Sequence, residues 1–327
     1  MRKVIANRTG RSLASIGWRL PLVRLIMPPR PTVLVYHNVL RTGDGNSLDA
    51  TSFEKQIAFL KENFEFISPK SLGDCRRRTG RPQVLLTFDD GMRNNFEVAR
   101  PILARHHVPA LFFISSRHAV PGQYLWFAYL RALNKYFPRD GFLFRRAYID
   151  MRPAVREASM KRLTEFLLNL KPHPSAMYSA IQEELPPLED FVSPGLRDEC
   201  EGMTEEQVGE LTANTLFSVG CHTVDHPFLS RCEPEEMRRQ IAENKSWLES
   251  ASGLKCDAIA YPLGDYNAQV LGVCRSLFSQ GYAVSASLRS APELEIPRIG
   301  IYSTSLEFLG FKVLWGNLLR AARIAVG

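Results

Sequence analysis

The sequence has few cysteines and no closely spaced pair of them. Six cysteines are spread over 327 residues without a Cys-x-x-Cys spacing. Cysteines this sparse argue against a fold held together by disulfide bonds. We therefore expect the cysteines to be mostly reduced and mostly buried.

The N-terminal segment 1–30 lacks both the uninterrupted apolar run and the small-residue cleavage site of a secretory signal peptide. Arg19 and Arg24 interrupt its apolar residues, which also makes it too polar to span a membrane. The pattern fits either a basic amphipathic segment on an anionic membrane surface or an ordinary solvent-facing helix packed on the core. The tail 304–327 is expected to form a second amphipathic helix. These features favour a cytoplasmic or peripheral membrane location.

Signatures of nucleic-acid binding are missing as well. The sequence contains no zinc-finger, recognition-helix or ribonucleoprotein motif, only scattered basic residues. The net charge of +7 is moderate and favours anionic neighbours, either a membrane surface or acidic glycans. We expect no nucleic-acid partner, and a basic nucleic-acid binder is kept only as a weaker alternative.

Short apolar runs bounded by turn-forming residues alternate with helical patterns along most of the chain. The clearest runs are 32–39, 84–88, 108–115, 216–220 and 258–261. With 45% hydrophobic residues, the chain is able to bury a sizeable core. The alternation predicts a parallel α/β sheet or barrel.

One stretch, 122–202, departs from this alternation, with no strong strand signal and with helical patterns at 124–137 and 153–170. We interpret it as a helical insertion that could shape access to a substrate. The predicted organisation is therefore a basic N-terminal segment (1–30), a core in two parts (31–121 and 203–303), the insertion (122–202) and the C-terminal helix (304–327).

Two pairs of polar residues follow strands of the predicted core. Asp89 and Asp90 directly follow the run 84–88. His222 and His226, four residues apart, follow the run 216–220. An Asp-Asp-Gly alone is often only a polar turn, and a lone His-x-x-x-His spacing is often a coincidence. On one helical turn, however, two histidines four apart would face the same ion. Together with a carboxylate they would form a catalytic divalent-metal site.

Three motifs in this order, TFDDG, HTVDHP and AYPLGDYN, resemble those of the polysaccharide deacetylase family, carbohydrate esterase family 4, with its NodB-homology domain. The resemblance implies a distorted (β/α) barrel that removes N-acetyl groups from amino sugars. It implies that Asp89 is the general base and that Asp90, His222 and His226 bind a divalent metal, with Zn²⁺ favoured. A metal in such a site polarises the amide carbonyl and a water molecule.

The chain departs from the common family pattern at two positions. Many members carry a late histidine as general acid, but no histidine follows His226. His37, in a Tyr-His that is similar to the N-terminal motif of one subgroup, is assigned instead; the alternative is a buried, hydrogen-bonded histidine. Ala260 stands where many members have an arginine that orients the base. Arg298 could supply that guanidinium, and a surface salt bridge is the equal alternative.

Residues of the third motif are expected to line the substrate pocket. Tyr261, Pro262 and Leu263 are the main candidates, Asp265 and Tyr266 are weaker candidates for sugar contacts, and Arg298 is also assigned to substrate binding. Asp225 is expected to face solvent or to support the ligands rather than to bind the metal. The four remaining histidines are expected to be structural or superficial: His106, His107, His118 and His173.

The sequence thus predicts a metal-dependent hydrolase that removes N-acetyl or other N-acyl groups from an amino-sugar polysaccharide or a lipid-linked glycan. Peripheral membrane contact is expected from the two amphipathic ends. The alternative is a non-catalytic carbohydrate-binding protein that retains the deacetylase fold. Intact residues at all four chemical positions argue against that alternative.

Overall fold

The computed structural model describes residues 31–43, 47–73, 81–284 and 291–313. The predicted N-terminal segment 1–30 and most of the C-terminal helix lie outside these residues, although 306–313 are helical. None of the described helices is both long and apolar enough to cross a membrane. The described cysteines are free thiols, and all of them except Cys232 are buried, as predicted.

A parallel sheet that curls into a nearly closed barrel forms the centre of the protein. Its strand order is β10-β9-β8-β7-β4-β3-β1-β11, and the short β2 (Glu65–Phe66) pairs with β3. The strands are β1 (Thr32–Tyr36), β3 (Gln83–Phe88), β4 (Ala110–Ile114), β7 (Phe217–Cys221), β8 (Ala258–Ala260), β9 (Gln280–Ala283), β10 (Ile296–Pro297) and β11 (Ile299–Gly300).

One short segment closes this barrel. Residues 296–297 pair with β9 at one end of the sheet, and residues 299–300 pair with β1 at the other. Arg298 lies between the two pairings, so the residue at the seam is fixed from both sides. The predicted distorted (β/α) barrel of NodB-homology type is confirmed.

Alternation along the strands builds two apolar layers. Val33, Leu85 and Leu111 belong to a small cluster with Phe113 and Tyr282, whereas the residues that follow the first three in sequence belong to the main core. Because neighbouring side chains on a strand point to opposite faces, the first group fills the barrel and the second packs under the helices.

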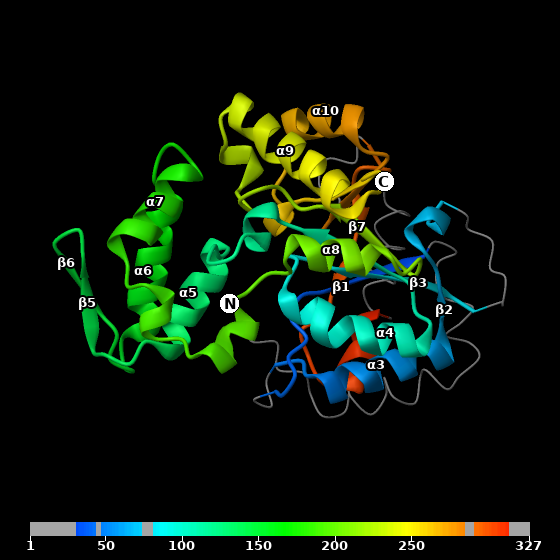
Figure 1. The fold of residues 1–327 in the computed structure, drawn as a ribbon, viewed down its shortest axis with the longest axis horizontal. Helices are drawn as coiled ribbons and strands as arrows, with labels where there is room; N and C mark the ends of the chain where they lie inside the picture. The colour runs from blue at the N-terminus through cyan, green and yellow to red at the C-terminus, as the bar shows by residue number, and fades with distance from the viewer. Residues whose placement is uncertain (1–30, 44–46, 74–80, 285–290, 314–327) are drawn as a thin grey trace.

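Five α-helices of the described chain cover the barrel. They are α3 (Ala50–Asn63), α4 (Arg100–His106), α8 (Glu205–Thr212), α9 (Pro234–Ser252) and α10 (Ala268–Leu277) (Figure 1). Thr204 and Gln207 form a capping box at the start of α8, and Gly253 ends α9 in a left-handed conformation at φ 65°. A π-helical stretch, Asn95–Ala99, precedes α4, and the α-helix proper begins at Arg100, next to Pro101.

The segment 122–202 packs around an apolar cluster of its own, beside the barrel (Figure 1). It contains α5 (Trp126–Tyr136), α6 (Arg156–Leu168) and α7 (Ser175–Glu184). Its boundaries at 122 and 202 stay a prediction.

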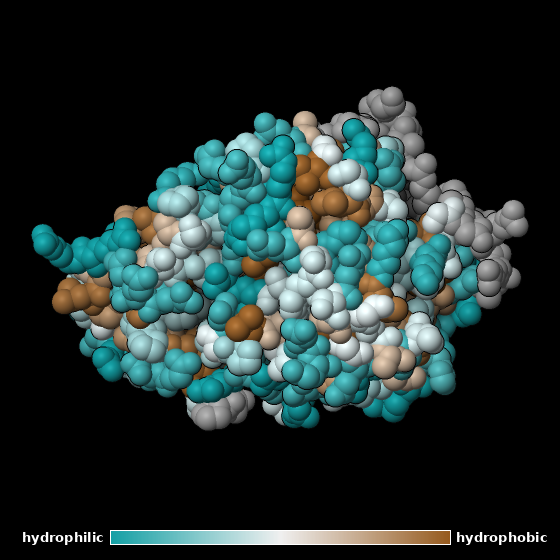
Figure 2. Space-filling model, turned by 45° about the horizontal axis from the view of Figure 1, so that its top comes forward, coloured by the Kyte–Doolittle hydropathy of each residue, from teal (hydrophilic) through white to brown (hydrophobic). Residues whose placement is uncertain are grey.

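This segment also contains a hairpin that the sequence pattern did not predict, β5 (Gly141–Phe144) and β6 (Ala147–Asp150). The turn is made by Arg145 and Arg146 at φ 46° and 68°. Tight turns with this conformation usually contain Gly or Asn, and arginine rarely adopts it. The local sequence therefore contains no signal for this turn. Leu143 and Tyr148 on the two strands are exposed. Figure 2 shows hydrophobic residues at this outer end of an otherwise mostly hydrophilic face.

Candidate functional site

The candidate residues come from different strands but meet at one rim of the barrel. Asp89 and Asp90 follow β3, His222 and His226 follow β7, and His37 follows β1. Because all these strands are parallel, their carboxyl ends lie on the same side. The fold therefore gathers residues that are up to 189 positions apart in sequence.

Asp90, His222 and His226 form a compact buried cluster. The Asp90 Oδ1 atom lies 3.5 Å from His222 Nε2 and 3.4 Å from His226 Nε2. One possible ligand atom from each residue lies within 4.8 Å of the others. Three donors that converge from two loops, two nitrogen and one oxygen, are the set that a catalytic divalent-metal site presents.

The turn that presents Asp90 requires a glycine next to it. Asp90 and Gly91 both adopt left-handed conformations, at φ 76° and 71°. A Cβ on Gly91 would lie 2.6 Å from the Ile114 side chain, closer than packed atoms allow. Gly91 therefore lets the turn press against β4 while it directs Asp90 toward the histidines.

The two histidines do not share a helical turn, contrary to the expectation from their spacing. Thr223 and His226 have φ 65° and 51°, so the segment is a loop with two left-handed residues. The Thr223 hydroxyl accepts a hydrogen bond from the His226 N–H at 3.1 Å. The centroids of the two rings nonetheless lie 4.9 Å apart, because the left-handed residues bend the loop so that both rings come together.

Hydrogen bonding and burial set the protonation of the two rings. His222 Nδ1 is 2.9 Å from the Ala260 carbonyl, so Nδ1 carries the hydrogen, and Nε2 faces Asp90. Burial and the nearby charge of His222 lower the pKa of His226 to about 3, so that ring is neutral. Burial disfavours the charged form of His222, but Asp89 and Asp90 outweigh it and raise the pKa of His222. A metal ion would compete with that proton for Nε2.

Burial also raises the pKa of the Asp90 carboxyl group, but the influences that lower it, led by the hydrogen bond to His222, outweigh burial, and the net pKa is lowered. Asp90 is therefore an ionised candidate ligand, and the donor set fits a divalent cation.

Arg298 holds Asp89 in a two-point contact. Arg298 Nη1 donates to Asp89 Oδ1 at 2.6 Å, and Nη2 donates to Oδ2 at 2.7 Å. Nη1 also lies 3.3 Å from the Thr87 hydroxyl. Only 5% of Arg298 is exposed, so the alternative of a surface salt bridge is wrong. Burial raises the pKa of Asp89, but the Arg298 charge leads the influences that lower it overall, so Asp89 is ionised.

His37 lies beside the two aspartates at the exit of β1. Its backbone carbonyl accepts a hydrogen bond from Asn95 at 2.6 Å, and its ring centroid is 5.5 Å from that of Tyr302. The residue as a whole is partly exposed, whereas its Nδ1 atom is buried and has no hydrogen-bond partner among the described residues. The alternative of a buried, hydrogen-bonded histidine therefore does not fit, whereas the role of His37 as an acid stays a prediction.

Three residues of the third motif that were predicted as substrate contacts are instead engaged within the protein itself. Tyr261 is buried in the main core, where its hydroxyl donates to the Leu294 carbonyl, and Pro262 is buried beside it. The Asp265 carboxylate accepts bonds from the backbone and side chain of Ser230, so it ties two loops together. Large aromatic rings after a strand suggest a pocket, but here they fill the space under α10.

Of the remaining residues of this motif, Leu263 is exposed, in a left-handed conformation at φ 58°. Tyr266 is buried, stacks on Tyr261 and donates to Glu295, so it is not available for a sugar.

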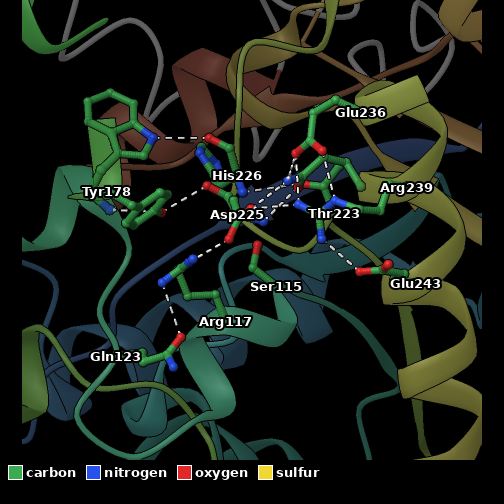
Figure 3. A network of polar contacts seen from close by, with 12 residues as sticks. Ser115, Arg117, Gln123, Tyr178, Thr223, Asp225, His226, Glu236, Arg239 and Glu243 are labelled. Atoms are coloured by element: carbon green, nitrogen blue, oxygen red, sulfur yellow. Dashed lines mark hydrogen bonds and ion pairs between the residues drawn. The ribbon is translucent and has the colours of Figure 1, made fainter. Parts of the chain in front are cut away.

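Asp225 is buried, not solvent-facing. Its carboxylate accepts hydrogen bonds from Arg117, Arg239 and Gln240, as Figure 3 shows in part. Gln240 belongs to α9, as does Asn244, which accepts a bond from the His222 N–H at 2.9 Å. Gln240 and Asn244 were missed, although polar residues four apart within the apolar stripe of α9 were a signal.

His118 is structural, as predicted. Its Nδ1 lies 3.1 Å from the Asp90 carbonyl and its Nε2 lies 2.7 Å from the Cys200 carbonyl. It therefore ties the Asp90 turn to the end of the insertion, a contact that no local pattern signals.

Comparison with known proteins gives consistent results. A family model described as polysaccharide deacetylase matches residues 76–142 and 175–281, more than half of the chain. One relative is the YxkH protein of Bacillus subtilis (strain 168), whose name describes it as a polysaccharide deacetylase. It is 20% identical over 250 residues, which are 75% of this chain and 60% of that protein. The chain thus spans less than two thirds of that relative.

Solved structures share the fold. The deacetylase PplD of Streptococcus pyogenes, solved in complex with acetate, has a TM-score of 0.52 and 20% identity, over 84% of this chain and 92% of that one. IcaB from Ammonifex degensii has a TM-score of 0.53 and 20% identity, over 89% and 98% of the two chains.

Proposed function

The chain belongs to the polysaccharide deacetylase family, and from this premise we propose that it is a metal-dependent hydrolase that removes N-acetyl groups from the amino sugars of a glycan. The observation that carries the proposal is the pairing of two sites at one barrel rim. A buried Asp-His-His cluster lies beside an aspartate that is held ionised by Arg298. A non-catalytic binding protein would need neither.

Asp90, His222 and His226 would hold the metal, and Zn²⁺ is the favoured ion because it accepts two imidazoles and a carboxylate. When bound, it supplies Lewis acidity toward the amide carbonyl and a water molecule.

Asp89 is the proposed general base. Its carboxylate is ionised, buried and fixed in orientation by the two Arg298 hydrogen bonds, so it is ready to take a proton from the attacking water. Arg298 is then a positioning residue. It takes the place of the base-orienting arginine that many family members carry where this chain has Ala260.

His37 is the proposed general acid, which places the chain near the subgroup with an N-terminal Tyr-His. The departing amine must gain a proton, and His37 stands at the same rim as Asp89. The position of His37 and the absence of a later histidine support this role.

The proposed substrate is a polysaccharide or lipid-linked glycan that contains N-acetylated amino sugars. The family name and the acetate bound to the Streptococcus pyogenes deacetylase support the glycan and the acetyl group. Membrane contact through the segments outside the described residues remains part of the proposal.

The test is acetate release from chitooligosaccharides, poly-N-acetylglucosamine and peptidoglycan fragments, before and after chelation and Zn²⁺ addition. We expect release that stops on chelation and returns with metal. Asp89→Asn should bind metal without turnover, whereas Asp90→Asn should bind metal weakly. Glycan binding by the metal-loaded protein without any acetate release would contradict the proposal.

A further inference from the structure

The two histidine ligands of the candidate metal centre are fixed in different ways. His222 is oriented by its second ring nitrogen, which bonds to the Ala260 carbonyl. His226 Nδ1, in contrast, is buried without a partner among the described residues. Since a ligand histidine is usually oriented by a hydrogen bond from its other nitrogen, something else must hold His226.

Side chains from the insertion supply that support. Trp126 Nε1 donates to the His226 carbonyl at 3.0 Å, and the adjacent Phe127 ring lies 4.7 Å from the His226 ring. Both residues begin α5, and Trp126 is buried. The insertion thus fixes the backbone of His226 and packs on its imidazole.

Tyr178 of α7 extends the same contact to the preceding residue. Its hydroxyl donates to the Asp225 carbonyl at 2.9 Å and accepts a bond from the Trp126 N–H at 3.2 Å. The Arg117 guanidinium lies 3.9 Å above the Tyr178 ring and bonds to the Asp225 carboxylate. Figure 3 shows Tyr178 and Arg117 on one side of the loop and the α9 side chains on the other.

The position of His226 needs this support because its backbone is strained. His226 is not a glycine, yet it has φ 51°, a sparsely populated left-handed conformation that persists only where surrounding contacts hold it. Trp126 and Tyr178 bond the two successive carbonyls of this turn, 225 and 226, and they do so from a buried position. Without these bonds the loop would be free to relax toward a conformation that turns the ring away from Asp90.

The other end of the insertion fixes the second ligand loop. The Glu201 carbonyl, within the insertion, accepts a hydrogen bond from the Arg93 N–H at 2.8 Å, and directly after the insertion the Met203 N–H donates to the Gly91 carbonyl at 2.9 Å. These bonds flank the turn that carries Asp90. The insertion therefore contacts both loops that supply the metal ligands.

We propose that the insertion is part of the metal centre, with Trp126 and Tyr178 as positioning residues that hold His226 toward Asp90. This inference rests on the proposed function only in that the cluster must bind a divalent cation.

The test measures Zn²⁺ affinity of the full chain, stripped of metal, by competition with a chromophoric chelator. Trp126→Phe removes the indole N–H, and Tyr178→Phe removes one oxygen atom. We expect each variant to bind Zn²⁺ about 10–100-fold more weakly, the usual effect of losing a group that orients a ligand. The visible spectrum of bound Co²⁺ should change as well, because the geometry of the site changes.

Two substitutions in the same chain serve as matched controls. Tyr129→Phe removes a buried hydroxyl that donates to the Pro186 carbonyl inside the insertion, away from the loop. Trp247→Phe removes an indole N–H that donates to Glu205. Both control variants should bind Zn²⁺ with wild-type affinity, even if the urea midpoint of the metal-free protein falls as far as it does in Trp126→Phe and Tyr178→Phe.

Equal Zn²⁺ affinity in the wild type and in Tyr178→Phe would overturn this inference but not the proposed function. If Trp126→Phe does not fold, Tyr178→Phe, which removes only one oxygen atom, is the deciding variant. An equal loss of affinity in Tyr129→Phe would also overturn it, since the effect would then be general to the insertion. No Zn²⁺ binding by the wild type would overturn the metal centre of the proposed function, and the inference with it.

Discussion

Arg298→Met should destabilise the protein strongly, because it leaves a buried carboxylate without its partner. Both residues are almost fully buried, and the pair is joined by two hydrogen bonds. Removing one member of such a pair typically costs about 3–5 kcal/mol. For a chain of 327 residues, each kcal/mol lowers the melting temperature by about 1.5 °C, so we expect a fall of roughly 4–7 °C.

A double-mutant cycle separates the pair from general damage to the barrel seam. Asp89→Asn alone leaves the guanidinium buried without an anion, so it should also destabilise. The double variant removes both charges and should be more stable than the sum of the two losses implies, by about 2–3 kcal/mol. Urea unfolding of the four proteins gives these values, and Arg298→Lys, which keeps the charge but not the fork, should fall between wild type and Arg298→Met.

The same substitution should change the pH dependence of stability. In the wild type the pKa of Asp89 is lowered, so its contribution to stability is present above the unfolded pKa and is lost as the pH falls through the folded pKa. Without Arg298, burial dominates and the pKa of Asp89 rises above its unfolded value. The gap in stability between variant and wild type should therefore narrow as the pH falls from 7 to 5. Additive losses within about 0.5 kcal/mol, or a gap that does not change with pH, would refute the reasoning.

The remaining predictions concern histidines. His222→Ala or His226→Ala should lose the metal and nearly all activity; full metal content by elemental analysis would remove the ligand assignment. His37→Gln should lose about 10²–10⁴ in kcat with unchanged metal content, and less toward an activated ester, whose leaving group needs little protonation; the same fractional loss on amide and ester would exclude His37 as the acid. Burial, reinforced by Lys171 and Arg231, lowers the pKa of His173 to about 4, so the wild type should lose stability as the pH falls from 6.5 to 4, and His173→Gln should lose less in urea titrations.

Local patterns in the sequence were enough to predict the main strands, a helix cap and the candidate metal ligands. The apolar run of β3 followed by two aspartates and a glycine needed no distant residue to be understood, because strand, turn and carboxylates are neighbours in the chain. The same holds for the histidines after β7 and for the capping box of α8. The parallel barrel followed from the alternation of such units.

Only the tertiary structure decided which candidates point into the site. Tyr261 and Asp265 were polar or aromatic residues after a strand, yet one fills the core and the other ties down a loop. Sequence position after a strand places a residue at the rim but leaves its direction open, because that depends on the helix or loop packed above it.

The contacts that complete the site are long-range, and no local pattern encodes them. Arg298 reaches Asp89 across 209 positions because one segment closes the barrel, and Trp126 reaches His226 across 100 positions because the insertion folds back onto the loop. The sequence therefore determined which groups are available for the chemistry. Barrel closure and docking of the insertion decided which of them meet, since those contacts exist only once distant segments have packed together.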